Sequence, residues 1–188
     1  MNKSVKIFLS LTIVSLMAVS CDRSSPLPDD KKAAEEQNDA KFTDKASEKD
    51  AKYVVDAYNA GLMEISQAQL AQKRAINTEV KNMADMMVTA HTSMNAELAA
   101  IAAKKQITLP AELTESEQKE VNSLADKTGR DFDKAYVDKL ISAHKDAVSL
   151  FQDASQNATD GDIRALFVKG LPIVQSHLDM AKNLDDKL

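Results

Sequence analysis

Four long stretches of the chain carry apolar residues at steps of three and four, the spacing that places them on one face of an α-helix. These stretches cover about 48–73, 78–105 and 130–157, and a fourth follows Gly161. No stretch shows the strict alternation of apolar and polar residues that predicts a β-strand. The pattern therefore predicts an all-α fold built from four long amphipathic helices.

Polar residues before these stretches indicate where the helices begin. Ser47 and Asp50 are spaced as a capping box for the first helix, and Asn77 can cap the second. Residues 114–117, Thr-Glu-Ser-Glu, form a second capping box. This box predicts an extra short helix, to about Lys127, before the third long helix.

The fourth long helix contains a proline. Pro172 cannot donate the backbone hydrogen bond to the carbonyl of Val168, so we expect the helix to kink or restart near Gly170. The irregularity lies five residues before His177. It either aims that imidazole or simply fits the helix into the bundle.

The chain has three histidines, and each falls on the apolar face of a different predicted helix. They are His91, His144 and His177, and the apolar face of the first helix carries a single charge, Glu64. A buried carboxylate without a partner is costly, so Glu64 needs one. Small residues around Glu64, including Gly61, allow a neighbouring helix to come close.

Counting along the helices brings these four side chains to a similar depth. With short connections and antiparallel neighbours, depth follows from a rise of about 1.5 Å per residue. His144 and His177 then match across the connection near residue 159, and His91 and His144 match across the preceding connection. The Glu64 backbone is offset by about 7 Å, but side chains lean toward helix N-termini, which closes this gap. The sequence predicts one buried layer of Glu64, His91, His144 and His177.

Three interpretations fit such a layer. Three imidazoles and a carboxylate suit one transition-metal ion such as Zn²⁺, Fe²⁺ or Cu²⁺. The same groups can form a structural hydrogen-bond network in which Glu64 accepts from two imidazoles. An acid–base catalytic site without metal is the third interpretation, although the sequence shows no glycine-rich phosphate loop and no nucleophile beside a base. The methionines at 83, 87 and 94 share the face of His91; methionine commonly fills irregular core space, and ligation of a soft metal ion is the alternative.

The N-terminus predicts a targeting segment. Two lysines precede a mostly apolar run of thirteen residues, 7–19, and small residues stand just before Cys21. A bilayer-spanning helix needs about 20 apolar residues, so the run indicates a secretory signal. The lone Cys21 resembles a bacterial lipoprotein processing site, at which the thiol is acylated and becomes the new N-terminus. An ordinary signal peptide that happens to contain a cysteine is the alternative.

The predicted domain organisation follows from this segment. Residues 1–20 form the signal peptide, 21–46 the lipidated cysteine and a flexible linker that can be partly helical around Lys31–Ala40, and 47–188 one helical domain. We expect a protein anchored by its lipid in the bacterial cell envelope, at the outer membrane or facing the periplasm. The membrane is then its one predicted partner, and the sequence identifies no protein partner.

Charge and cysteine content exclude other classes. Without residues 1–20 the chain keeps 22 basic and 29 acidic residues, a net charge of −7, whereas nucleic-acid-binding domains are typically basic. We therefore predict no nucleic-acid partner. Cys21 is the single cysteine, so an internal disulfide cannot form and the fold must depend on its core.

Four short motifs resemble those of the bacterial domain-of-unknown-function family 4142. They are Gly-Leu-Met-Glu at 61–64, Met-Met-Val-Thr-Ala-His at 86–91, Phe-Asp-Lys-Ala-Tyr at 132–136 and Leu-Pro-Ile-Val-Gln-Ser-His at 171–177. The resemblance covers most of residues 48–186 and implies a ferritin-like antiparallel four-helix bundle, often in predicted outer-membrane proteins, with no assigned activity. Ala90 departs from the family pattern, which usually has Asp before the histidine.

A ferritin-like fold does not imply a di-iron centre in this chain. Such centres use a Glu-x-x-His pair on each of two helices. The residues three positions before the histidines are Val88, Ile141 and Val174, and none is acidic. The sequence therefore argues against a carboxylate-bridged di-iron site and favours a single ion.

Overall fold

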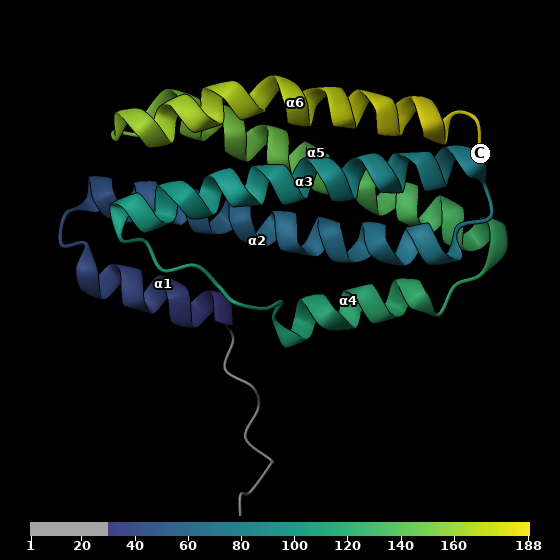
Figure 1. Cartoon of the computed structure of the whole chain (residues 1–188), viewed down its shortest axis with the longest axis horizontal. Helices are drawn as coiled ribbons and strands as arrows, with labels where there is room; N and C mark the ends of the chain where they lie inside the picture. The colour runs from purple at the N-terminus through teal and green to yellow at the C-terminus, as the bar shows by residue number, and fades with distance from the viewer. Residues whose placement is uncertain (1–29) are drawn as a thin grey trace, which may run out of the picture.

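The computed structural model describes residues 30–188, which form six α-helices and no β-strand (Figure 1). The prediction of an all-α bundle, with a short helix before the third long one, is confirmed. The predicted signal peptide and Cys21 lie outside the described residues. The helices are α1 (Asp30–Lys41), α2 (Lys45–Arg74), α3 (Thr78–Lys105), α4 (Glu115–Ala125), α5 (Gly129–Asn157) and α6 (Gly161–Asp185).

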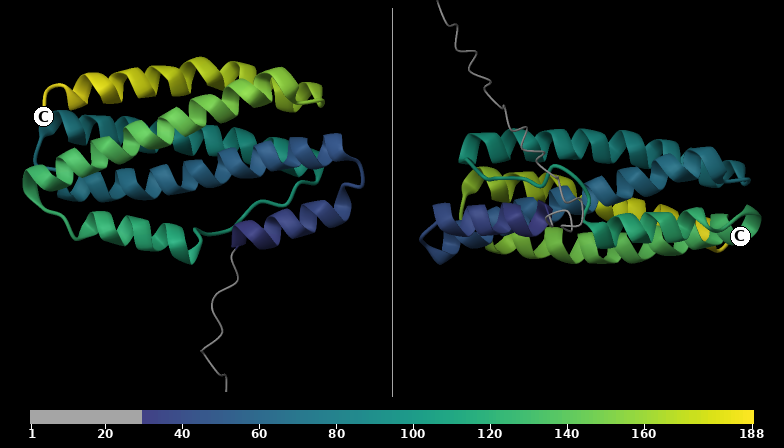
Figure 2. Two further views of the ribbon diagram at one scale, coloured as in Figure 1. Left: turned by 180° about the vertical axis from the view of Figure 1, so that it is seen from behind. Right: turned by 90° about the horizontal axis from the view of Figure 1, so that it is seen from below.

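The four long helices α2, α3, α5 and α6 form the bundle, and α1 and α4 pack on its outside (Figures 1 and 2). Short turns join α2 to α3 and α5 to α6, and each of these two pairs packs extensively. Helix α1 lies on α2, and α4 contacts both α2 and α5. Both outer helices therefore cover the same side of the bundle.

The connection between α3 and α5 differs from the short antiparallel turn that the depth count assumed. Helix α4 carries the chain back along the bundle, so α3 and α5 run in the same direction (Figure 1). His91 and His144 still reach the same depth because each lies near the middle of its helix. A residue at mid-helix keeps its depth when the helix direction is reversed.

Local capping confirms two of the three predicted helix starts. The Asn77 side chain accepts from the backbone N–H groups of Glu79 and Val80, and residues 114–117 form the predicted capping box. The start of α2 was predicted wrongly. Its cap is Asp44, whose carboxylate accepts from the N–H of Ser47.

Asp50, the other member of that predicted box, has a long-range role. Its buried carboxylate accepts from the backbone N–H groups of Thr159 and Asp160, at 3.0 and 2.7 Å, and from the Thr159 hydroxyl at 2.7 Å. It thereby satisfies donors in the turn between α5 and α6. A buried carboxylate with three donors is stabilised where an unpaired one would not be.

The segment predicted as flexible linker contains α1. Ala34 and Asn38 are buried, and the Asn38 side chain exchanges two hydrogen bonds with the backbone of Thr108, at 2.7 and 2.9 Å. The predicted helical tendency around Lys31–Ala40 is thus realised as a packed helix. The folded domain accordingly begins before residue 47.

Helix α6 continues through Pro172 without a break, so it does not restart there, and a kink stays a prediction. Gly170 instead allows close packing of α6 on α5. A Cβ atom at this position would clash with the ring of Phe151. Gly61 serves α2 in the same way, because a Cβ there would meet the side chain of Asn95 on α3.

The apolar core consists of two clusters, one in each half of the bundle. One contains Val54, Phe151 and Phe167, and the other contains Met87 and Phe132. The predicted polar layer lies between the two in sequence on every long helix. The buried apolar residues of the described part extend from Ala34 to Leu184, so the core runs through nearly the whole of residues 30–188, which we expect to fold alone.

Candidate metal centre

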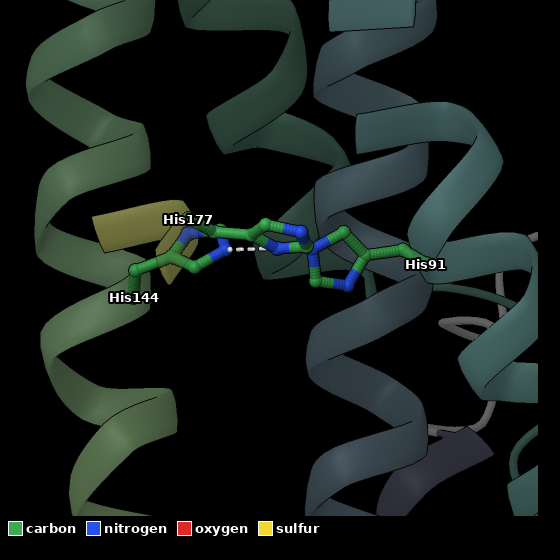
Figure 3. A group of neighbouring side chains, drawn as sticks. All are labelled: His91, His144 and His177. Atoms are coloured by element: carbon green, nitrogen blue, oxygen red, sulfur yellow. Dashed lines mark hydrogen bonds between the residues drawn. The ribbon is translucent and has the colours of Figure 1, made fainter. Parts of the chain in front are cut away.

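Three imidazoles from three helices meet in the middle of the bundle. His91 on α3, His144 on α5 and His177 on α6 point toward one another, and each is at most 5 % exposed (Figure 3). Their ring centroids form a nearly equilateral triangle with sides of 5.4, 5.4 and 5.3 Å. The predicted convergence of the histidines is therefore present in the structure.

The nitrogen atoms of this cluster lie close enough together that they could hold a metal ion. One nitrogen from each ring lies within 4.8 Å of the others, and His144 Nε2 is 3.3 Å from His177 Nδ1. Two imidazole nitrogens bound to one tetrahedral Zn²⁺ at about 2.0–2.1 Å would lie about 3.3–3.4 Å apart. The observed spacing thus matches one edge of a tetrahedral site.

The carboxylate of Glu64 on α2 belongs to the same layer and lies beside the Nδ1 atoms of His91 and His144. Its Oε2 lies 3.0 Å from His91 Nδ1, and its Oε1 lies 3.1 Å from His144 Nδ1. The carboxylate is 4 % exposed, and the His91 Nδ1–H donates to it. The partner that this buried acid requires is therefore the imidazole of His91. Glu64 does not belong to the group of three residues whose atoms could hold a metal ion together.

The hydrogen bonds fix the tautomers of two histidines. His144 Nδ1 is 3.0 Å from the Leu140 carbonyl oxygen, which can only accept, so this nitrogen carries the proton. Glu64 Oε1, although close to the same nitrogen, makes no hydrogen bond. In His91 the proton is likewise on Nδ1, and the buried Nε2 has no hydrogen-bond partner among the described residues. The Nε2 lone pair of His91 is therefore without a partner among the described residues, whereas that of His144 faces His177 Nδ1 at 3.3 Å and can accept a hydrogen bond from it.

Burial and charge keep this layer in the protonation states that bind metal. Desolvation is the main cause that lowers the pKa of His144, and it lowers the pKa of His177 to about 4. For Glu64, burial raises the pKa, but the hydrogen bond from His91 and the charges of the three imidazoles outweigh it, so the pKa is lowered. At neutral pH the layer offers an ionised carboxylate beside neutral His144 and His177 rings.

Tyr136 on α5 is a residue of this region that the sequence pattern did not single out. Its side chain is 1 % exposed, and its hydroxyl has no hydrogen-bond partner among the described residues. Burial, together with the negative charge of Glu64, raises its pKa, so it stays a protonated donor. Its place two turns before His144, on the same face, was the available signal.

Other polar residues of the predicted stripes have structural roles. Asp133 accepts from the backbone N–H groups of Ile76 and Asn77 at 3.1 and 2.9 Å. It thus closes the turn between α2 and α3 from the neighbouring helix α5. Met83 and Met87 are buried in the core, as expected for methionine filling.

Comparisons with known proteins place the fold without naming an activity. The family model described as "Domain of unknown function (DUF4142)" matches residues 33–184. No curated protein matches the sequence. A crystal structure of a DUF305 fragment from Deinococcus radiodurans is similar, with a TM-score of 0.65 and 12 % identity over 74 % of this chain and 96 % of that chain. At this identity the likeness shows the helical fold alone.

Proposed function

We propose that this chain, which belongs to the DUF4142 family of domains of unknown function, binds one transition-metal ion in the interior of its bundle. The ligands are the imidazoles of His91, His144 and His177. The observation that carries the proposal is the approach of three buried ring nitrogens, from three separate helices, to within 4.8 Å. The chain serves as a binding module, for sequestration or for protection against metal stress, and no catalytic residue is assigned.

Each histidine contributes one nitrogen. His91 and His144 bind through Nε2, because their Nδ1 atoms carry protons directed at Glu64 and at the Leu140 carbonyl. His177 binds through Nδ1, the atom that faces His144. Glu64, predicted from the sequence as a fourth ligand, then acts through His91 by fixing its tautomer and orientation, as carboxylates commonly do behind metal-bound imidazoles.

This ligand set suits a borderline ion. Neutral imidazole is a ligand for Zn²⁺, Cu²⁺ and Fe²⁺ alike, and three protein ligands leave a fourth position for water or another small ligand. Hard ions such as Mg²⁺ and Ca²⁺ prefer oxygen ligands and fit poorly here. The proposal is therefore one Zn²⁺, Cu²⁺ or Fe²⁺ ion per chain.

A structural polar layer is the second candidate, and one contact favours it. The separation of 3.3 Å between His144 Nε2 and His177 Nδ1 also permits a hydrogen bond, with His177 donating. In that case the layer fixes the register of the helices and no ion binds. Metal content separates the two candidates.

For the cellular location we infer, from residues 1–46, a protein held by a lipid at Cys21 in the bacterial cell envelope. The helices of residues 30–188 include none with the length and hydropathy to cross a bilayer. Labelling with radioactive palmitate in a bacterial host, with Cys21→Ser as the control, tests this inference. Absence of label from the parent protein would refute it.

Elemental analysis of the purified 22–188 fragment tests the metal proposal. We expect about one ion per chain after loading and dialysis, since the cluster offers one group of three nitrogens. His144→Ala removes a central ligand and should abolish stoichiometric binding. His177→Gln, which keeps a polar side chain in the layer, should do the same with less effect on folding.

Circular dichroism of each variant checks that the helical fold is intact. A metal-free parent fragment that remains folded after exposure to Zn²⁺, Cu²⁺ and Fe²⁺ would overturn the metal proposal in favour of the structural layer. Stoichiometric binding that survives both substitutions would place the ion elsewhere.

A further inference from the structure

A groove opens between α3 and α6, close in sequence to the histidine on each of these helices. Its volume is about 160 Å³, and its wall includes Ala90, the residue before His91, and Ile173, one helical turn before His177. A site of this size can hold several water molecules or a partly hydrated ion. The groove therefore begins within one helical turn of His91 and of His177, and the core residue Phe151 of α5 also lines it.

The groove and the cluster lie on one line along α3. His91, Met94 and Glu97 follow one another at steps of three, so they form one ridge whose face turns from the interior at His91 toward solvent at Glu97. His91 is buried, Met94 is partly buried and lines the groove, and Glu97 is exposed. A cation moving inward along this face meets a carboxylate, then a thioether, then an imidazole.

The facing side of α6 repeats this order at steps of four. His177 lies opposite His91, with 5.4 Å between ring centroids, Ile173 lines the groove, and Lys169 stands at its mouth. Lys169 Nζ lies 2.8 and 2.7 Å from the two carboxylate oxygens of Glu97. This exposed ion pair closes the outer end, and because exposed pairs contribute little stability it can open readily.

Neither α1 nor α4 packs on the seam between α3 and α6. Helices α1 and α4 lie on α2 and α5, on the opposite side (Figure 1). Contacts between α3 and α6 are much less extensive than those within the pairs α2–α3 and α5–α6. A small movement of this seam therefore disturbs less packing than any route through the covered side.

A second groove on the same seam is a poorer route. It is lined on α3 by Met83 and Met86, eight and five residues from His91. Met87, which is fully buried, lies between Met86 and His91 in the sequence. The second groove thus lies farther from His91 along α3 than the first groove, and it provides a matched control.

We propose that the groove between α3 and α6 is the route by which the metal ion enters and leaves the histidine cluster, with Glu97 attracting the cation at the mouth. This inference rests on the proposed metal-binding function and adds the path and its charged entrance. The approach of a divalent cation is favoured by the Glu97 carboxylate and opposed by Lys169.

Stopped-flow loading with Co²⁺, whose visible absorption reports tetrahedral coordination, tests the route in the 22–188 fragment. Ser93→Phe fills the proposed groove from an exposed position on α3, and Asn82→Phe fills the second groove from the same helix. We expect Ser93→Phe to slow loading and release by about tenfold or more with an unchanged dissociation constant, and Asn82→Phe to change neither. Ile173→Phe obstructs the route from α6 and serves if Ser93→Phe folds poorly.

Lys169→Met provides a test of opposite sign. It removes the cation and leaves the Glu97 carboxylate free, so loading should accelerate about two- to fivefold at low salt and return toward the parent rate at high salt. Equal rates in the parent and both groove-filling variants would overturn the route while leaving metal binding intact. A parent fragment that binds no Co²⁺ would overturn the metal-binding function, and the route with it.

Discussion

Replacing Glu64 by glutamine tests whether this carboxylate holds the histidine cluster ready for metal. The substitution keeps the size of the side chain and an oxygen that can accept from His91 Nδ1, at present 3.0 Å away, but removes the negative charge. Carboxylates behind metal-bound imidazoles typically contribute 10- to 100-fold, about 1.4–2.8 kcal/mol, to metal affinity. We expect Glu64→Gln to weaken metal binding by an amount in this range.

The stability of the metal-free protein should respond differently. Removing a buried charge relieves its desolvation cost, while the new NH2 group takes the place of Oε1, which has no hydrogen-bond partner and lies 3.1 Å from His144 Nδ1, so the two effects oppose each other. The free energy of unfolding should therefore change by no more than about 1 kcal/mol. Affinity is measured by competition with a chromogenic chelator, and stability by urea unfolding of the metal-free 22–188 fragment.

Asp133→Asn is the matched control. Asp133 is an equally buried carboxylate on α5 that accepts from two backbone N–H groups at the turn between α2 and α3, outside the cluster. Its substitution should cost about 1–3 kcal/mol of stability and leave metal affinity unchanged. The two variants thus separate an effect on the site from a general loosening of the fold.

Two results would refute this reasoning about Glu64. Unchanged metal affinity in Glu64→Gln would show that the carboxylate does not support the site. An equal loss of affinity in Asp133→Asn would show that affinity follows global stability. A loss as large as that of a histidine substitution would instead indicate that Glu64 binds the ion directly, as the sequence first suggested.

Three further predictions follow from buried groups. The pKa of His177 is lowered to about 4 from an ordinary 6.5, so the unfolded chain binds more protons than the folded chain between these pH values. The free energy of unfolding of the metal-free fragment should therefore fall by roughly 1–3 kcal/mol as the pH falls from 6.5 to 4. Urea midpoints that do not change over this range would contradict this prediction. Asp50→Ala leaves the backbone donors of Thr159 and Asp160 without their acceptor and should lower the free energy of unfolding by about 2–4 kcal/mol. Thermal or urea unfolding measures this change. A loss of less than about 0.5 kcal/mol, typical of an exposed residue, would be evidence against the role of Asp50 at this turn. Gly170→Ala should destabilise the fold by about 1–3 kcal/mol, despite alanine's better helix propensity, because the new Cβ meets the ring of Phe151. Adding Phe151→Leu should restore part of this loss. A Gly170→Ala variant that is more stable than the parent would show that α5 and α6 can move apart at no cost.

The helices themselves were predictable because their causes are local. Apolar residues at helical spacing, the Asn77 cap and the capping box at 114–117 act within a few residues of one another. The bounds of α3 agree with the prediction at both ends for this reason. Local signals also explain the error at α2, where Ser47 and Asp50 are spaced as a capping box but the cap in the structure is Asp44. Asp50 instead accepts hydrogen bonds from a turn more than one hundred residues away in the sequence.

For the site, the sequence alone determined which side chains face inward and roughly how deep they lie. The predicted depths of His91 and His144 agree although the connection between α3 and α5 is not the short antiparallel turn that was assumed, because both residues lie near the middle of their helices. It could not determine which ring nitrogen faces which neighbour. That choice depends on helix rotation and on single acceptors, such as the Leu140 carbonyl beside His144 and the carboxylate of Glu64.

Only the tertiary structure decided that Glu64 lies behind the imidazoles, and that α1 and α4 pack on α2 and α5 and not on the seam between α3 and α6. Periodicity reports one helix at a time, whereas the direction of a ring nitrogen or the opening of a groove is set by how several helices pack together. Residues distant in sequence come close together only when the bundle forms, and a metal site requires their ligand atoms to lie at coordination distances.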